Sequence, residues 1–272
     1  MKIAVIADVH ANLAALESVL DHIRGQGADA IWCLGDLIGY GPDPRACIQA
    51  AGQFAVNLLG DHEEAACLGA VGFNPMARIA IDWTRKQLSL ETEPAEKNRD
   101  LWNFLGRLEK RCTLGDFHLV HGSPREPTRE YVFKQDFKDR AKMDALFASP
   151  DDVEWKVCLA SHTHQSGVFV QGDRYAFLAP ADCGHEYRHA GLKRRILVSV
   201  GSVGQPRDGD WRASYVTVDE EMIHFHRVEY DRQRTIDRYK KFPELPARLA
   251  NLPGTPFSED ELAATGRLRA NI

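Results

Sequence analysis

The sequence predicts an α/β protein in which two β-sheets stack, with helices between and outside the two groups of strands. Two observations predict this class. In the first 60 residues, short apolar runs alternate with segments of helical periodicity, which is the pattern of strands and helices in a parallel sheet. After residue 110 the pattern changes to short apolar runs joined by Gly-Asp turns, which is typical of antiparallel hairpins.

The N-terminal part is predicted to hold three strands and two helices. The strands are expected at residues 2–7, 30–34 and 54–59, and the first run is continuously apolar, as in a strand buried on both faces. Asn12 can cap the helix that follows the first strand, and Gly25 is expected to end it. Pro44 suits the first turn of a second helix, which is expected to end near Gly52.

The middle of the chain is predicted to be helical, and the part after it to be mainly β. Asn74-Pro75 opens one helix, and another is expected over residues 97–108. The second group of strands is expected at residues 111–114, 117–120, 168–171, 174–178, 195–200, 213–218 and 222–228.

The end of the chain is predicted to hold a helix near residues 233–241 and then a Pro-punctuated stretch. That stretch contains a capping box formed by Ser258 and Glu261. We expect one domain over residues 1–242. Residues 243–272 are expected to be a tail with a short helix, either part of the same domain or peripheral to it.

Composition argues against several classes of protein. The 272 residues carry 34 basic and 39 acidic side chains, a formal charge of −5, whereas a dedicated nucleic-acid binder has a basic excess. We therefore expect no binding to nucleic-acid duplexes. No apolar run approaches the roughly 18 residues that cross a bilayer. Six cysteines without a Cys-x-x-Cys pair indicate neither a zinc knuckle nor a disulfide framework, so we expect a soluble cytoplasmic protein without membrane association.

Acidic and histidine residues gather directly after the apolar strands. The fragments are Asp8-Val9-His10, Gly35-Asp36, Gly60-Asp61-His62-Glu63, His121-Gly122 and Ser161-His162-Thr163-His164. Ligands of open α/β sheets collect outside the carboxyl ends of the strands. Residues two apart in an extended segment point to one side, so Asp8 with His10, and His162 with His164, can chelate an ion.

Two similar patterns, Asp116-x-His118 and His224-x-His226, do not fit a site of this kind. His118 lies inside a predicted strand and faces away from His121. His224 and His226 alternate with apolar residues, as on the solvent-exposed face of an edge strand.

The five fragments together predict a pair of metal ions. One Asp after a strand is more often a helix cap, but carboxylates clustered without counter-charge repel one another, so a cluster implies cations. Three carboxylates and four histidines are too many ligands for one zinc and suit two transition metals. A shared carboxylate would hold the ions about 3.5–4 Å apart, the spacing that clamps a phosphoryl group. The predicted chemistry is hydrolysis of a phosphate ester or anhydride.

The ordered motifs resemble those of the calcineurin-like metallophosphoesterases. The flanks narrow the resemblance to the bacterial phosphodiesterase branch over roughly residues 1–230. These flanks are Asp8-Val-His-Ala-Asn-Leu-Ala-Ala-Leu, Gly35-Asp-Leu-Ile-Gly-Tyr-Gly-Pro-Asp-Pro and Gly201-Ser-Val-Gly-Gln-Pro-Arg-Asp-Gly-Asp210. The resemblance implies a four-layer αββα sandwich with two stacked mixed sheets and a binuclear site. It implies two transition-metal ions, Mn or Fe or both, with Zn as a further candidate.

The resemblance also implies a role for each site residue. One ion would be held by Asp8, His10, Asp36 and His164, and Asp36 would bridge to a second ion held by Asp61, His121 and His162. His62 would stabilise the transition state or protonate the leaving oxygen, with a bridging hydroxide as nucleophile. Glu63 either orients His62 or is an ordinary carboxylate at a helix start.

Two positions depart from the family's pattern. Ser161 replaces the usual Gly before His162, which is expected to affect little beyond local backbone freedom. Asp61 stands where the family has Asn. Two divalent ions, a hydroxide, Asp8 and Asp36 sum to one positive charge, and Asp61 brings that sum to zero. Three readings follow: reduced activity toward dianionic monoesters, a trivalent ion such as Fe(III), or an engineered or degenerate site.

Three further residues are candidates for contacts with the substrate. Arg207 can reach a non-bridging phosphate oxygen with two N–H groups. Gly201 begins a turn that either cradles a phosphate or packs below the metal site. Tyr40 either stacks on a nucleobase or belongs to a rigid loop beside the site.

The sequence therefore predicts a metal-dependent phosphohydrolase, in first place a phosphodiesterase acting on a small nucleotide-like or other organic phosphate. A Ser/Thr phosphoprotein phosphatase or a dinucleoside polyphosphate hydrolase would use the same core. From another class, a binding scaffold without turnover is the alternative, favoured by Asp61 alone and opposed by the retention of His62 and the other ligands.

Overall fold

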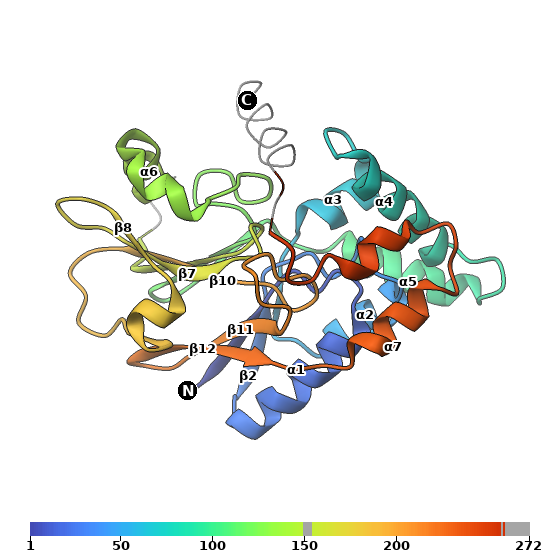
Figure 1. The fold of residues 1–272 in the computed structure, drawn as a ribbon, viewed down its shortest axis with the longest axis horizontal. Coiled ribbons are helices and arrows are strands. Elements are labelled where there is room, and N and C mark those ends of the chain that lie inside the picture. The colour runs from blue at the N-terminus through green and yellow to red at the C-terminus, as the bar shows by residue number, and fades with distance from the viewer. Residues whose placement is uncertain (149–153, 257, 259–272) are drawn as a thin grey trace.

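Two six-stranded sheets form the centre of the computed structural model, which describes residues 1–148, 154–256 and 258 (Figure 1). The first sheet consists of β1 (Ile3–Ile6), β2 (Ala30–Cys33), β3 (Val56–Asn57), β9 (Glu186–Arg188), β11 (Ala213–Val218) and β12 (Met222–Val228). Its strand order is β3-β2-β1-β11-β12-β9. Strands β1, β2 and β3 are parallel, and the other three pair in antiparallel fashion, so the sheet is mixed.

The second sheet is also mixed. It consists of β4 (Arg111–Leu114), β5 (Phe117–Val120), β6 (Val157–Ala160), β7 (Ser166–Val170), β8 (Ala176–Leu178) and β10 (Ile196–Val200). Its order is β4-β5-β6-β10-β7-β8, in which β5, β6 and β10 run parallel. The parallel strands of each sheet therefore present their carboxyl ends on one side, where the predicted site residues follow.

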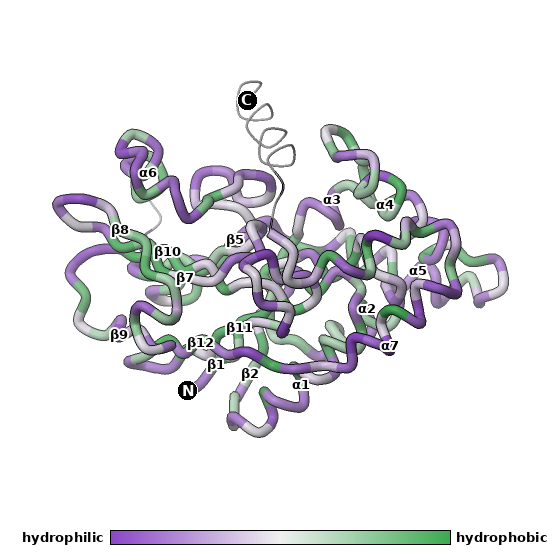
Figure 2. Tube along the Cα trace, in the orientation of Figure 1, coloured by the Kyte–Doolittle hydropathy of each residue, from purple (hydrophilic) through white to green (hydrophobic). Residues whose placement is uncertain are grey.

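One apolar core lies between the two sheets and another lies between the first sheet and its helices, which explains why β1 is apolar throughout. In β1, Ile3 and Val5 pack in the core shared with the second sheet, whereas Ala4 and Ile6 pack under the helices. Both faces of the strand are thus buried, as the continuous apolar run predicts. The hydropathy of the chain shows the same arrangement, with apolar segments concentrated along the central strands (Figure 2). Each fully buried Val or Ile contributes about 1.5–3 kcal/mol relative to an exposed one.

Helices cover the outer faces of both sheets and complete a four-layer αββα sandwich. The helices are α1 (Leu13–Gln26), α2 (Pro44–Ala51), α3 (Asp61–Leu68), α4 (Pro75–Leu88), α5 (Ala95–Leu105), α6 (Arg140–Phe147) and α7 (Arg232–Tyr239). Side chains of α1 to α5 share a core with β1 and β2. Helix α6 packs against the outer face of the second sheet through Met143 and Leu146. Short 3₁₀ segments are η1 (Lys134–Lys138), η3 (Pro180–Cys183) and η4 (Ala247–Asn251).

Several predicted boundaries agree with the structure and others are corrected. Strands β4, β5, β11 and β12 begin and end where the sequence predicts. Helix α1 does not end at Gly25 but continues to Gln26, because Gly27 is the residue in the left-handed conformation that ends a helix. The third strand is shorter than residues 54–59, and the predicted helix over 97–108 spans Ala95–Leu105.

The interpretation that His224 and His226 lie on an edge strand was wrong, and both residues are half-buried. Strand β12 pairs with β11 on one side and with β9 on the other, so it lies inside the sheet. The His226 ring stacks on Tyr215 with 4.7 Å between ring centroids, and His226 Nε2 lies 2.8 Å from Thr217 Oγ1. Strand β9 is too short and too polar to be recognised from its apolar pattern.

The described part of the tail packs on the helices. Leu245, Leu249 and Leu252 are buried in one cluster with Trp83 of α4 and Tyr239 of α7. The capping box of Ser258 and Glu261 extends beyond the described residues.

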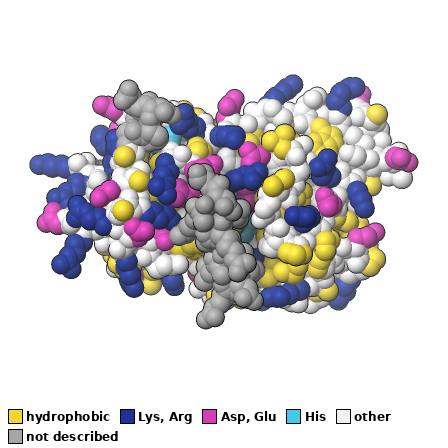
Figure 3. Space-filling model, turned by 90° about the horizontal axis from the view of Figure 1, so that it is seen from above, with side chains coloured by type: hydrophobic (Ala, Val, Ile, Leu, Met, Phe, Trp, Pro, Cys, Tyr) yellow, Lys and Arg dark blue, Asp and Glu magenta, His cyan; other side chains and the backbone are white. Residues whose placement is uncertain are grey.

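The surface mixes charge types. On the face seen in Figure 3, basic and acidic side chains are interspersed, and apolar side chains are visible beside them. Among the described residues, exposed large apolar side chains include Leu68, Val71 and Ile79 around α3 and α4. None of the described helices combines the length and the apolar character needed to span a bilayer.

Candidate metal centre

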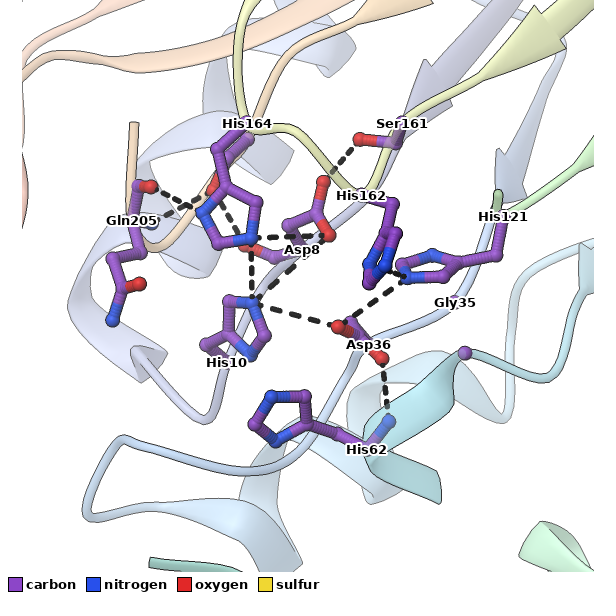
Figure 4. A network of polar contacts seen from close by, with 12 residues as sticks. Asp8, His10, Gly35, Asp36, His62, His121, Ser161, His162, His164 and Gln205 are labelled. Atoms are coloured by element: carbon purple, nitrogen blue, oxygen red, sulfur yellow. Dashed lines mark hydrogen bonds and ion pairs between the residues drawn. The ribbon is translucent and has the colours of Figure 1, made fainter. Parts of the chain in front are cut away.

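The five polar fragments meet where the parallel strands of both sheets end. Asp8 and His10 follow β1, Asp36 follows β2, and Asp61 with His62 begins α3 after β3. From the second sheet, His121 follows β5, and His162 with His164 follows β6 (Figure 4). All of these residues are buried, at most 7% exposed. The structure therefore brings together every residue that the resemblance implies as a metal ligand.

The first group of possible ligands consists of Asp8, His10 and His164. His10 Nε2 and His164 Nε2 are 3.1 Å apart, and Asp8 Oδ1 lies 3.5 Å from His164 Nε2. Asp8 Oδ1 is buried and has no hydrogen-bond partner among the described residues. Asp8 Oδ1, His10 Nε2 and His164 Nε2 are therefore close enough together to bind one ion.

The second group consists of Asp36, Asp61, His121 and His162. His121 Nε2 lies 3.1 Å from His162 Nδ1, and Asp61 Oδ1 lies 3.5 Å from each of these nitrogens. Asp36 also forms a third set of possible ligands with His10 and His62, and through His10 it comes close to the first group. Its Oδ2 lies 3.4 Å from His121 Nε2 and 3.6 Å from His10 Nε2, so one carboxylate oxygen stands between the two groups.

The orientation of the imidazoles fits metal ions. His10 Nδ1 lies 3.1 Å from the carbonyl oxygen of Ile38, and His164 Nδ1 lies 2.6 Å from that of Gln205. Because a carbonyl only accepts, each Nδ1 carries the proton, and each Nε2 presents a lone pair. Two lone pairs that face each other at 3.1 Å repel unless a cation lies beside them. Imidazole nitrogens with carboxylate oxygens are a donor set of transition metals, so the residues fit the two implied ions.

Burial keeps most of these histidines in the neutral form that binds metals. It lowers the pKa of His162 to about 3, and it holds the pKa values of His10 and His164 well below 6.5. His121 differs. Burial alone would lower its pKa, but the negative charges of Asp36 and Asp8 and hydrogen bonds with Asp36 and Asp61 raise it well above its usual value. The same negative charges attract a metal cation.

The backbone of the ligands is strained. Asp8, His10, Asp36, His162 and His164 all have φ between 46° and 65°, in the left-handed region. Each such non-glycine residue costs on the order of 1–3 kcal/mol, and such strain clusters at functional sites. Gly60 is needed for the same packing, because a Cβ there would lie 2.1 Å from Asp36 Oδ1.

The Ser161 hydroxyl makes a contact with a proposed metal ligand that the sequence did not predict. Its hydroxyl contacts Asp8 Oδ2 and lies 2.8 Å from the carbonyl oxygen of Gly201. A hydrogen bond from Ser161 to Oδ2 leaves Asp8 Oδ1 facing His10 and His164. A Gly at position 161 would lack this contact.

The turn that begins at Gly201 lies directly below the first group. Val203 N donates to the carbonyl of Ala7 at 3.0 Å, and Gly204 N donates to that of Asp8 at 2.9 Å. These N–H groups bind backbone carbonyls of the segment after β1 that carries Asp8 and His10. The contacts favour the interpretation of this turn as packing below the site over that of a phosphate cradle.

His62 lies at the edge of the centre and is held by aromatic rings. Its backbone N–H donates to Asp36 Oδ1 at 3.0 Å, and its ring centroid is 4.6 Å from that of Tyr40 and 5.3 Å from that of Phe73. His62 Nδ1 is buried without a hydrogen-bond partner among the described residues. Burial lowers the pKa of His62 to about 4, although Asp61 acts in the opposite direction. The Tyr40 ring contacts His62 and His10, as expected of a rigid loop beside the site.

Arg207 and Tyr131 complete the surroundings. Arg207 is 3% exposed, and its Nε and Nη2 donate to Gln205 Oε1 at 3.1 and 2.8 Å. Its charge contributes to the lowered pKa of His164. The ring of Tyr131 stacks on His162 with 3.7 Å between centroids. Sequence reasoning missed Tyr131, because a lone Tyr in the long connection after β5 carries no local pattern.

Comparison with known proteins agrees with this geometry. Residues 1–191 match the family described as calcineurin-like phosphoesterase. The uncharacterized protein MJ0912 of Methanocaldococcus jannaschii is 32% identical over 254 residues, which cover 88% of this chain and 92% of that protein.

Two solved structures share the fold over most of their length. A metallophosphoesterase from Sphaerobacter thermophilus is 34% identical, with a TM-score of 0.73 and coverage of 94% of this chain and 99% of its own. The hypothetical protein PH1004 from Pyrococcus horikoshii OT3 is 18% identical, with a TM-score of 0.69 and the same coverage. The chain therefore belongs to the calcineurin-like phosphoesterase family, whose members are metal-dependent hydrolases of phosphoric esters.

Proposed function

We propose that this enzyme hydrolyses a small organic phosphodiester, with nucleotide-like esters among the candidates, at a centre of two transition-metal ions. The observation that carries this proposal is the place of Asp36, whose Oδ2 lies between His10 of one ligand group and His121 of the other. When bound, two ions that share this carboxylate would polarise the phosphoryl oxygens and lower the pKa of bound water.

The residues around the centre would have separate roles in binding the ions and the substrate. Asp8, His10 and His164 would hold one ion, Asp61, His121 and His162 the other, and Asp36 both. Arg207, braced by Gln205, would donate to a non-bridging oxygen of the phosphate. His62 would donate a hydrogen bond or a proton to the leaving oxygen, because its ring lies next to that of His10 at the edge of the centre.

The preference for diesters follows from Asp61. With three carboxylates and a hydroxide, two divalent ions give a centre without net charge, which attracts a dianionic monoester less than a centre with one positive charge would. A diester carries only one negative charge, so its attraction to the centre is reduced less. We expect kcat/KM with Mn²⁺ to be higher for bis-p-nitrophenyl phosphate than for p-nitrophenyl phosphate. A strong preference for the monoester would favour a phosphatase. Hydrolysis of neither, with two ions bound, would favour a binding scaffold.

The variant Asp61→Asn tests the role of that charge directly. We expect it to raise kcat/KM for the monoester relative to the diester by about tenfold, because one negative charge near the phosphate is removed. Steady-state rates on both substrates measure the effect. Elemental analysis and electron paramagnetic resonance (EPR) of the purified enzyme show whether Fe(III) balances Asp61 instead. All-divalent metal together with an unchanged substrate ratio would contradict both explanations.

We also propose that the described part of residues 243–272 belongs to the domain formed by residues 1–242. The support is the burial of Leu245, Leu249 and Leu252 against α4 and α7. A cytoplasmic location is proposed as well, since all six cysteines are free thiols, as in a reducing compartment.

A further inference from the structure

We propose that Glu63 is the positioning residue that assembles both metal sites, by holding the loops that carry the ligands in one arrangement. The proposal rests on the proposed function only in assuming that two ions bind. Glu63 is the third residue of α3 and is fully buried, although it is not among the possible ligands of either group.

The Glu63 carboxylate accepts three backbone hydrogen bonds from two separate loops. Oε2 accepts from Asp36 N at 2.8 Å and from Gly60 N at 2.9 Å, and Oε1 accepts from Ile38 N at 3.0 Å. All three donors are N–H groups, so a group that only accepts is required at both positions. A carboxylate meets this requirement, whereas an amide would place an NH₂ group against one or two N–H groups.

These bonds fix the loop of the bridging ligand. Asp36 has φ of 54° and follows Gly35, whose φ is 104°, so the loop after β2 holds a conformation that it would not adopt alone. The bonds to the N–H groups of Asp36 and Ile38 keep it there. In this position Asp36 Oδ1 accepts from His62 N, and Oδ2 faces both ligand groups.

The loop after β1 depends on the Glu63 hydrogen bonds indirectly, through its contacts with the loop after β2. Asp8 N donates to the carbonyl of Gly35 at 3.0 Å, and His10 N donates to that of Asp36 at 2.9 Å. The carbonyl of Ile38, the residue whose N–H binds Glu63, accepts from His10 Nδ1 and so sets the orientation of that ring. Displacement of this loop would therefore move Asp8 and His10 together with Asp36.

Glu63 thus acts on ligands of both ions. Through Gly60 it sets the start of α3, where Asp61 and His62 lie, and through Asp36 and Ile38 it sets the other two loops. The sequence left two roles for Glu63 open, orientation of His62 or an ordinary carboxylate at a helix start. Glu63 is a carboxylate at a helix start, since it bonds the N–H before the helix, and it also reaches across to order the metal loops.

The test compares Glu63→Gln with Asp182→Asn as a matched control. Asp182 is also the third residue of a helical segment and also accepts a backbone N–H, that of Ala179 at 2.8 Å, but it is exposed and belongs to η3. Mn²⁺ binding is measured by calorimetry. Coupling between the two ions is measured by EPR, which distinguishes bridged pairs from isolated Mn²⁺. The Tm of the metal-free proteins monitors the fold.

We expect Glu63→Gln to weaken Mn²⁺ binding at both sites by roughly 10- to 100-fold and to lower the fraction of coupled pairs at equal occupancy. Asp182→Asn should leave both unchanged. Wild-type affinity and coupling in a folded Glu63→Gln protein would overturn the proposal. If that variant does not fold without metal, the same two measurements are made on Glu63→Asp. Its shorter side chain withdraws the carboxylate from the three N–H groups but keeps the charge. Failure of the wild-type protein to bind two ions would instead contradict the proposed function.

Discussion

Asp36→Asn is expected to lower kcat for phosphodiester hydrolysis by about a thousandfold, the upper end of the loss that follows removal of one preorganised electrostatic group. Asp36 Oδ2 lies within 3.6 Å of ligand nitrogens in both groups. Asn keeps an oxygen that can accept from His62 N, but its second atom is an NH₂ group that cannot bind a cation. The measurement is kcat with bis-p-nitrophenyl phosphate at saturating Mn²⁺, together with the number of ions bound.

The metal content shows whether the Asp36→Asn variant loses activity because it loses an ion or because a fully occupied centre reacts more slowly. We expect the Asp36→Asn protein to bind one ion tightly and the second weakly, because the shared ligand is gone. A variant that keeps more than about a tenth of wild-type kcat would contradict the bridging role of Asp36.

His62→Asn is expected to lower kcat by about 10²- to 10⁴-fold, the usual contribution of a positioned proton donor. Metal binding should be unchanged, because the contact of residue 62 with Asp36 is made by its backbone N–H. Steady-state rates and metal titration measure the two quantities on the same preparation.

The leaving group shows which role His62 performs. If His62 protonates the leaving oxygen, the loss in kcat is larger for a phenyl ester than for a p-nitrophenyl ester, since nitrophenolate departs without a proton. An equal loss for both esters would assign His62 to stabilisation of charge in the transition state instead. An unchanged kcat for both would exclude His62 from the chemistry.

Several strands could be predicted because burial of a strand leaves a direct trace in the sequence, but β6 and β9 were not among the predicted ranges. β1, β11 and β12 are short apolar or alternating runs, and their positions agree with the prediction within one residue at each end. Helix α3 was not delimited, since its buried residues include Asp61, His62, Glu63 and Glu64, and a helix that buries charged groups has no apolar stripe.

The positions of the site residues could be anticipated because each motif is local and follows a strand. What the sequence could not show are contacts between distant segments. Ser161 reaches Asp8 across 153 positions, and Tyr131 stacks on His162 from a different loop. Glu63 binds Asp36 and Ile38 across 27 and 25 positions, which only the folded chain brings together.

Each ligand group draws on both layers of the sandwich. Asp8 and His10 come from the first sheet and His164 from the second, and Asp36 and Asp61 are likewise joined by His121 and His162. Each ion would therefore act as a cross-link between the layers. Ligation at 100 times the Kd adds about 2.7 kcal/mol of stability per site. Conversely, heat or denaturant that loosens the sandwich would pull the ligands apart, so catalytic inactivation should precede global melting.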